Sequence, residues 1–148
     1  MRKVDTIVIH CSAGSQKATA ADIVSYHLKT LKWQRPGYHY IIEPDGNIVS
    51  TWPVERISNG VKGHNEHIIN VCYIGGIDAK GKAVDNRTAS QKAAIIAVIR
   101  ELRSRFGSLK VVGHRDLSPD VNRNGIVDPW ERIKECPCFD AIPEYNKI

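Results

Sequence analysis

The sequence predicts a single α/β domain, and three observations lead to this prediction. The chain has 148 residues, of which 42% are hydrophobic, and this supports one core with little room for a second. Short β-branched runs that are typical of buried strands alternate with stretches of helical periodicity. No internal repeat, low-complexity tract or linker separates them, so we expect one domain over residues 1–148.

The first two predicted elements are a strand and a helix. Residues 5–10 form an apolar, β-branched run that indicates a buried strand ending in His10. Thr19, with Asp22 three residues later, predicts the start of a helix. Apolar side chains at helical spacing continue this helix until Pro36 and Gly37 end it.

Strands dominate the middle of the chain. Two alternating runs joined by Pro-Asp-Gly, residues 38–43 and 47–52, predict a hairpin. Residues 53–67 have the composition of a loop, and residues 70–77 form a third apolar run, which contains two glycines.

The second half contains the clearest helix and one more strand. Thr88 as N-cap, with Gln91 completing a capping box, begins a helix that has one apolar face and ends at Gly107. Residues 109–114 then predict a strand that, like the first, leads directly into a histidine, His114.

These two histidines occupy equivalent places at the ends of predicted strands. Ligands of α/β folds bind where strands emerge at their carboxyl ends, so we expect His10 and His114 to face one crevice. Cys136 and Cys138 add thiols near the end of the chain. Cytosolic synthesis disfavours a disulfide, and redox pairs usually have two residues between their cysteines, which leaves a metal ligand or a buried thiol.

A catalytic zinc site takes three protein ligands from His, Cys and carboxylate side chains. His10, His114 and one cysteine of the Cys-Pro-Cys segment supply such a set. Taken singly, each of these residues fits an ordinary, partly buried side chain better than a ligand. Taken together, they fit a metal site equally well.

Four short motifs follow one another in register along the chain: "IVIHCSAG", "GYHYII", "VVGHRDLSPD" and "KECPCFD". Together they resemble the zinc-dependent N-acetylmuramoyl-L-alanine amidases, a family that includes phage endolysins and is similar to the peptidoglycan recognition proteins. The resemblance spans residues 10–140 and implies a mixed β-sheet flanked by helices, a zinc ion, and hydrolysis of the amide between N-acetylmuramic acid and L-alanine.

The resemblance also implies roles for individual residues. His10, His114 and Cys136 would hold the zinc ion, Lys134 would stabilise the oxyanion of the tetrahedral intermediate, and Tyr38 would be catalytic. Without the resemblance, Lys134 fits a cation in the last turn of a short helix and Tyr38 an ordinary strand aromatic.

The sequence departs from the family pattern at two positions. Gly60 stands near the place of a frequent histidine, and Asn70 replaces a glycine. Both positions are expected on the substrate side, so they bear on specificity more than on the metal.

A second ion site is predicted in residues 120–131, which have the spacing of an EF-hand-type calcium loop. We expect a structural calcium ion that fixes the path between His114 and Cys136. A helix start capped by Asp128, with Pro129 at its first position, explains the end of the loop equally well. The predicted ligands are Asp120, Asn122, Asn124, Ile126, Asp128 and Glu131.

Net charge and targeting signals limit the classes of partner and the cellular location that we expect. The net charge of +5 favours an anionic partner, although charge alone does not choose among nucleic acid, membrane surfaces and wall polymers. The resemblance selects peptidoglycan, so we expect no nucleic-acid partner. We expect cytoplasmic synthesis without a signal peptide or membrane span, action on the cell wall as a monomer, and export through a helper such as a holin.

A non-catalytic muropeptide-binding module is the main alternative function. Non-hydrolysing relatives commonly lack the cysteine ligand, whereas Cys136, Lys134 and Tyr38 are all present here. The resemblance therefore favours an enzyme.

Overall fold

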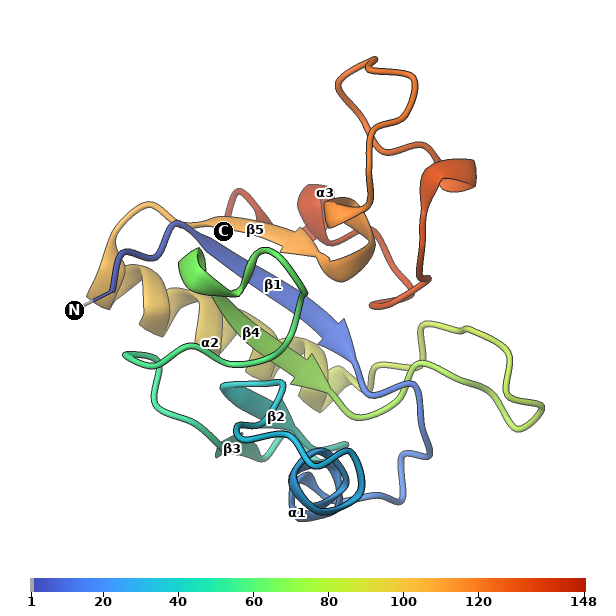
Figure 1. Cartoon of the computed structure of the whole chain (residues 1–148). Coiled ribbons are helices and arrows are strands. Elements are labelled where there is room, and N and C mark those ends of the chain that lie inside the picture. The colour runs from blue at the N-terminus through green and yellow to red at the C-terminus, as the bar shows by residue number, and fades with distance from the viewer. Residues whose placement is uncertain (1) are drawn as a thin grey trace.

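The computed structural model describes residues 2–148 and has a five-stranded sheet in the order β3-β2-β4-β1-β5 (Figure 1). Strand β1 lies between β4 and β5 and is parallel to both, β2 is parallel to β4, and β3 is antiparallel to β2. The sheet is therefore mixed, as the sequence and its resemblance predict. The strands are β1 (Thr6–Cys11), β2 (Tyr40–Ile42), β3 (Ile48–Ser50), β4 (Ile68–Tyr73) and β5 (Lys110–Gly113).

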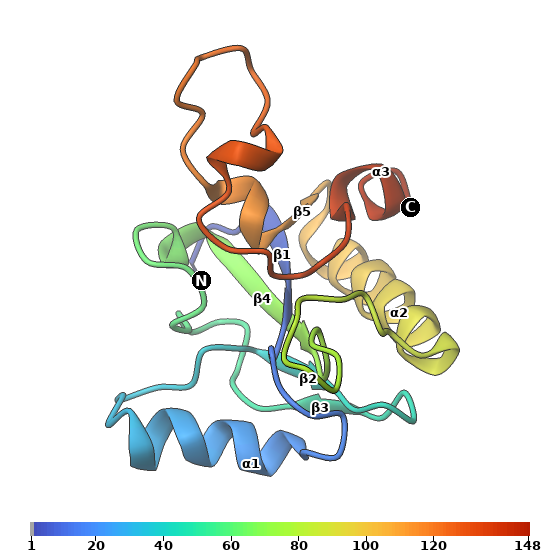
Figure 2. The same ribbon diagram turned by 90° about the vertical axis from the view of Figure 1, so that its right-hand side faces the viewer.

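Helices cover both faces of this sheet. Because successive strand side chains point to opposite faces, Val71 and Tyr73 of β4 pack toward α2 (Ala89–Phe106), whereas Cys72 packs with Ala20 of α1 (Ala20–Ser25). Figure 2 shows these two helices on different sides of the sheet. The larger core lies between the sheet and α2, whose buried residues are Gln91, Ala94, Ile95, Val98, Ile99 and Leu102.

The caps of both helices form as predicted. The hydroxyl of Thr19 accepts a hydrogen bond from the backbone N–H of Asp22, and that of Thr88 from Gln91. Gly107, with a φ of 85°, ends α2.

The hairpin strands β2 and β3 are shorter than the predicted residues 38–43 and 47–52, so Tyr38 lies outside the strand. The first helix and strand β4 also differ from the prediction. The first helix continues beyond Ser25 as a π-helical turn, η1 (Tyr26–Thr30), in which Leu31 N–H donates to Tyr26 O at 2.9 Å. Lys32 then adopts a left-handed φ of 59°, which ends the helix before Pro36. Strand β4 begins two residues earlier than predicted and ends at Tyr73, ahead of the two glycines.

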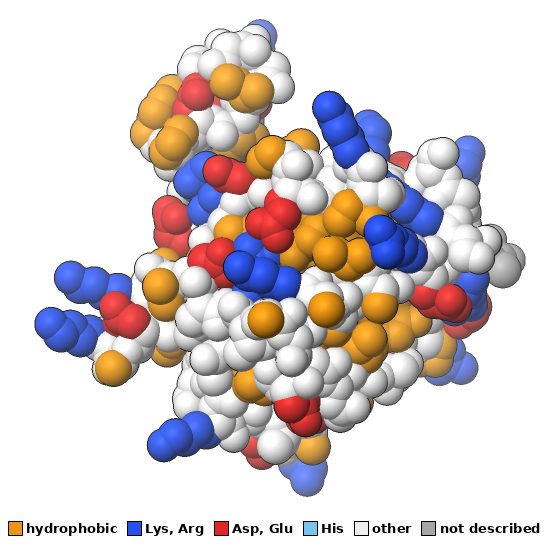
Figure 3. All heavy atoms as spheres, turned by 180° about the vertical axis from the view of Figure 1, so that it is seen from behind, with side chains coloured by type: hydrophobic (Ala, Val, Ile, Leu, Met, Phe, Trp, Pro, Cys, Tyr) orange, Lys and Arg blue, Asp and Glu red, His pale blue; other side chains and the backbone are white. Residues whose placement is uncertain are grey.

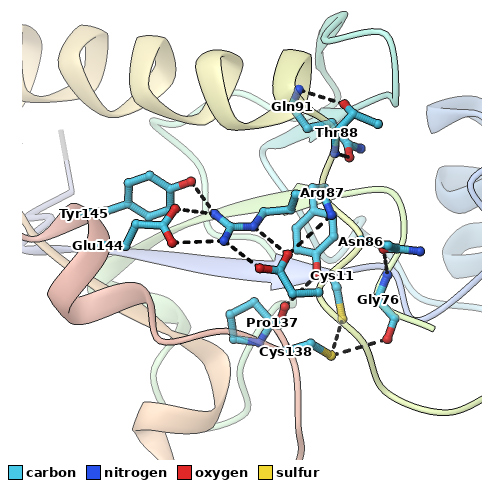
Figure 4. A network of polar contacts seen from close by, with 12 residues as sticks. Cys11, Gly76, Asn86, Arg87, Thr88, Gln91, Pro137, Cys138, Glu144 and Tyr145 are labelled. Carbon is cyan, nitrogen blue, oxygen red and sulfur yellow. Dashed lines mark hydrogen bonds and ion pairs between the residues drawn. The ribbon is translucent and has the colours of Figure 1, made fainter. Parts of the chain in front are cut away.

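Arg87 joins the start of α2 to the C-terminal helix α3 (Ala141–Tyr145). Its buried guanidinium donates to Asp85 at 2.8 Å and to Glu144 at 2.6 Å, as Figure 4 shows. It also lies over the ring of Phe139, 3.3 Å from the ring centre, and so anchors the segment that follows the Cys-Pro-Cys motif.

The segment between Ser118 and Glu135 forms a protruding loop (Figures 1 and 3). It contains the 3₁₀ turn η4 (Pro129–Glu131), and Figure 3 shows hydrophobic side chains gathered on it. Among the helices of residues 2–148, none combines the length and apolar character needed to cross a membrane. The exposed apolar residues of the loop are Val121, Ile126, Trp130 and Ile133.

Candidate active site and metal centre

His10 and His114 meet at one edge of the sheet, as predicted. Strands β1 and β5 are parallel neighbours in which Ile9 pairs with Gly113, so the histidine that follows each partner emerges at the same level. The two imidazole rings lie 4.8 Å apart between centres. Cys136 joins them, and one ligand atom from each of the three side chains lies within 4.8 Å of the other two.

Both imidazoles are neutral at pH 7, the form in which histidine binds metals. Burial, with a smaller contribution from the nearby His114, lowers the pKa of His10 to about 3. Burial also lowers the pKa of His114 to about 4, with a smaller contribution from the charge of Lys134. His10 Nδ1 is buried without a hydrogen-bond partner, whereas its Nε2 is bonded to Asn70. A buried ring nitrogen without a partner, in a residue grouped with two other donor side chains, fits a metal ligand.

Backbone contacts hold Cys136 beside the strand end. Its Sγ accepts a hydrogen bond from Cys11 N–H at 3.1 Å. Tyr73 OH donates to the carbonyl of Pro137 at 2.7 Å from within the core. A Cβ atom at Gly113 would lie 2.7 Å from Cδ of Pro137, so this close packing requires glycine. All four cysteines are free thiols, which excludes the disulfide interpretation.

Arg115 ties the two ligand-bearing segments together. Its backbone N–H donates to Cys136 O at 2.8 Å, and its guanidinium pairs with Asp140 at 2.6 Å. The Arg115 side chain is 8% exposed, whereas Asp140 is 64% exposed, so the ion pair is only partly shielded from solvent. This connection between His114 and Cys136 does not involve the protruding loop.

Tyr38 and Lys134 both border the cluster. The ring of Tyr38 lies 5.0 Å from that of His10, in the residues just before β2, and burial raises the pKa of its hydroxyl well above the ordinary value. Lys134 is exposed and lies beyond η4 in irregular structure, so its interpretation as a helix-terminal cation is wrong. Both residues line the same pocket as His114 and Cys136.

An adjoining cleft of about 460 Å³ extends this pocket along the surface. Trp33 and Lys134 border both hollows. The ring of Trp33 stacks on that of His27 at 4.7 Å, which holds the indole at the rim. Ile133 brings the protruding loop into the cleft wall, and Lys62 adds a positive charge.

A buried polar network behind His10 was not predicted from the sequence. Asn70 Nδ2 donates to Ser58 Oγ at 2.8 Å, and Asn70 N–H donates to His39 Nδ1 at 2.9 Å. These three side chains are fully buried. Only the departure from the family pattern at Asn70 gave a signal. Ser58 lies in a segment without a motif, and His39, although it follows Tyr38 in the "GYHYII" motif, had no predicted role.

The predicted calcium loop is held by hydrogen bonds among its own residues. Gly125 N–H donates to Asp120 Oδ2 at 2.8 Å, and Asp128 N–H donates to Glu131 Oε1 at 2.9 Å, as a helix start at Asp128 predicts. Within residues 2–148, the carboxylates of this loop do not form a cluster as close as that around His10. Calcium therefore stays a prediction. The other predicted ligands, Asn122, Asn124 and Ile126, are exposed.

Comparison with known proteins connects this geometry to one family. Residues 1–137 match the family described as N-acetylmuramoyl-L-alanine amidase. The endolysin of Escherichia phage T7 is 31% identical over 145 residues, which cover 97% of this chain and 86% of the endolysin. That of Enterobacteria phage K11 is 33% identical over 134 residues, covering 89% and 79%. An uncharacterized protein of Haemophilus influenzae is 40% identical over 97 residues, covering 66% and 84%.

Solved structures share the fold at lower identity. The N-acetylmuramoyl-L-alanine amidase LysC from Clostridium intestinale superposes with a TM-score of 0.75 at 22% identity, covering 99% of this chain and 84% of LysC. Drosophila PGRP-LB gives a TM-score of 0.72 at 18% identity, covering 97% and 80%. These matches confirm the predicted fold class.

Proposed function

This chain belongs to the N-acetylmuramoyl-L-alanine amidase family, and we propose that it hydrolyses the amide between N-acetylmuramic acid and L-alanine in peptidoglycan as a zinc enzyme. The observation that carries the proposal is the convergence of His10, His114 and Cys136 within 4.8 Å. The relatives named endolysins support action on the bacterial cell wall. The monomeric state and a holin-type export route stay predictions.

The donor set fits zinc. Two neutral imidazoles and one thiolate match the nitrogen and sulfur ligands that zinc prefers, and three protein ligands leave a position open for catalysis. When bound there, zinc supplies a Lewis acid that polarises the scissile carbonyl and activates water at neutral pH. The unpartnered Nδ1 of His10 supports this assignment, since it would otherwise remain a buried acceptor without a donor.

Lys134 and Tyr38 supply the groups that act on the substrate. The exposed ammonium of Lys134 lines the pocket beside Cys136 and stabilises the negative charge that develops on the scissile carbonyl oxygen. Tyr38, next to His10, offers a hydroxyl that orients water or hydrogen-bonds the intermediate.

The adjoining cleft is the proposed binding groove for the rest of the substrate. Trp33 presents an aromatic face, and Lys62 presents a charge that suits the carboxylates of the peptide stem. Contacts distant from the reacting bond position it against the catalytic groups.

The test combines metal analysis with release of free peptide from peptidoglycan, for wild type, Cys136→Ala and Cys138→Ala. We expect one zinc per wild-type chain and amide cleavage, with both lost in Cys136→Ala. Cys138→Ala is the matched control, because this neighbouring thiol lies near Cys11, with 3.9 Å between the sulfurs, and is not among the grouped ligands. Zinc-free wild-type protein that binds muropeptides without cleaving them would instead indicate a binding module.

A further inference from the structure

Within the part of the chain that the structure describes, Asn70 makes the only hydrogen bond to a ring nitrogen of His10. The amide Oδ1 lies 2.7 Å from His10 Nε2, and both residues are fully buried. Strands β1 and β4 are parallel with Val8 opposite Asn70, so the side chains of Asn70 and His10 share one face of the sheet. A carbonyl oxygen only accepts, so in this arrangement Nε2 carries the imidazole proton and Nδ1 keeps its lone pair.

The orientation of the amide is set by a chain of hydrogen bonds that begins at the backbone. Ser58 Oγ lies 3.1 Å from the carbonyl oxygen of Gly37 and 3.2 Å from His39 Nδ1. His39 Nδ1 already accepts from Asn70 N–H, so both of these neighbours are acceptors and the Ser58 proton points to one of them. Ser58 Oγ therefore accepts from Asn70 Nδ2, which leaves Oδ1 facing His10.

Gly60 leaves the space that this amide occupies. A Cβ atom at position 60 would lie 2.2 Å from both Cγ and Oδ1 of Asn70 and 2.4 Å from its Nδ2. No real Cβ approaches so closely, and all three atoms belong to a side chain fixed by the Ser58 bond. The two departures from the family pattern, at positions 60 and 70, are thus in direct contact.

We propose that Asn70 is a positioning residue that fixes the tautomer of His10 and presents its Nδ1 lone pair to the metal, and that Gly60 is its steric partner. The role toward the metal rests on the proposed zinc function. Control of the tautomer does not, since it is a property of the metal-free protein. Partners of this kind change metal affinity by about 10- to 100-fold when they are removed.

The test reads the tautomer and the metal affinity separately. Long-range ¹⁵N–¹H spectra of metal-free protein give the tautomer of His10, and competition with a chromogenic chelator gives the zinc dissociation constant. We expect the Nε2–H tautomer in wild type and a mixture in Asn70→Leu, with zinc affinity reduced about 10- to 100-fold. Asn70→Asp keeps an acceptor toward His10 and retains both the tautomer and affinity within a few-fold.

Two further variants separate positioning from simple destabilisation. Gly60→Ala displaces the amide and should reproduce the Asn70→Leu spectrum. Asn86→Leu removes another amide, which accepts from Gly76 N–H at 2.8 Å, and should lower the melting temperature without changing the His10 tautomer.

Distinct results would overturn the two proposals. An unchanged tautomer and zinc affinity in Asn70→Leu, or the Nδ1–H tautomer in wild type, would overturn the role of Asn70. Wild-type protein with the Nε2–H tautomer that binds no zinc would refute the zinc function while leaving tautomer control by Asn70 intact.

Discussion

Replacing Arg87 with methionine tests how the C-terminal segment is anchored. Methionine keeps much of the apolar stem, so the substitution mainly removes the guanidinium. That group is 2% exposed and forms ion pairs with Asp85 and Glu144. It also stacks on Phe139, which directly follows the Cys-Pro-Cys segment. We expect Arg87→Met to lower the free energy of unfolding substantially.

The magnitude follows from the exposure of the partners. Removing one partner of a buried ion pair costs about 3–5 kcal/mol. Asp85 and Glu144 are 31% and 40% exposed, so water solvates both carboxylates in the variant and the lower end of that range applies. At about 2–4 °C per kcal/mol for a chain of this size, 3 kcal/mol corresponds to a melting temperature lower by roughly 6–12 °C.

The same interaction predicts a pH dependence. Hydrogen bonds from Arg87 hold the pKa values of the Asp85 and Glu144 carboxyls below their ordinary values. A carboxyl with a lowered pKa in the folded state stabilises the fold above its unfolded pKa and loses this contribution as pH falls through the lowered value. The difference between wild type and Arg87→Met is therefore largest near neutral pH and shrinks below about pH 4.

Urea unfolding followed by circular dichroism, with a chelator present to remove metal effects, measures these differences. Arg105→Met is the matched control, because its partner Glu55 is exposed and this surface pair contributes little. If Arg87→Met and Arg105→Met unfold at the same urea concentration, or if their difference is independent of pH, the reasoning about the buried network is wrong.

Three other predictions concern the site and its surroundings. Gly113→Ala should displace Pro137 and thereby weaken zinc binding, which chelator competition measures. An unchanged zinc affinity would show that the packing of Gly113 against Pro137 does not position Cys136. Lys134→Met should lower kcat by about 10²- to 10³-fold with zinc content unchanged, while Lys134→Arg should retain more activity because it keeps the positive charge. Equal rates in wild type, Lys134→Met and Lys134→Arg would exclude oxyanion stabilisation by Lys134. Calcium bound by residues 120–131 should raise the melting temperature, and identical values with calcium and with chelator would count against it.

The cluster of His10, His114 and Cys136 depends on two levels of organisation. The parallel pairing of β1 with β5 brings His10 and His114 together, whereas the position of Cys136 depends on side chains outside those strands. Arg115 and Tyr73 hold the cysteine segment from two directions. Loss of either contact should therefore affect metal affinity more than it affects the sheet.

Local chemistry was sufficient to predict most of the elements and the two histidines of the site. The capping boxes at Thr19 and Thr88 involve residues three positions apart, so the helix starts are readable from sequence and are confirmed. Strand-terminal placement likewise predicted that His10 and His114 would share one edge, since side chains at the ends of adjacent parallel strands lie close together. The convergence of Cys136 with them rested on the family resemblance.

Tertiary structure decided how those residues are supported. Asn70 contacts His10 across 60 positions and Ser58 across 12, and Arg87 contacts Glu144 across 57. Each of these contacts joins two residues that are distant in the sequence and does not repeat along the chain, so it leaves no periodic pattern in the sequence. They depend on the exact fit of buried polar groups, which only the folded chain determines. The sequence alone thus determined which groups can bind a metal, and the fold determined which nitrogen of His10 is left without a hydrogen-bond partner.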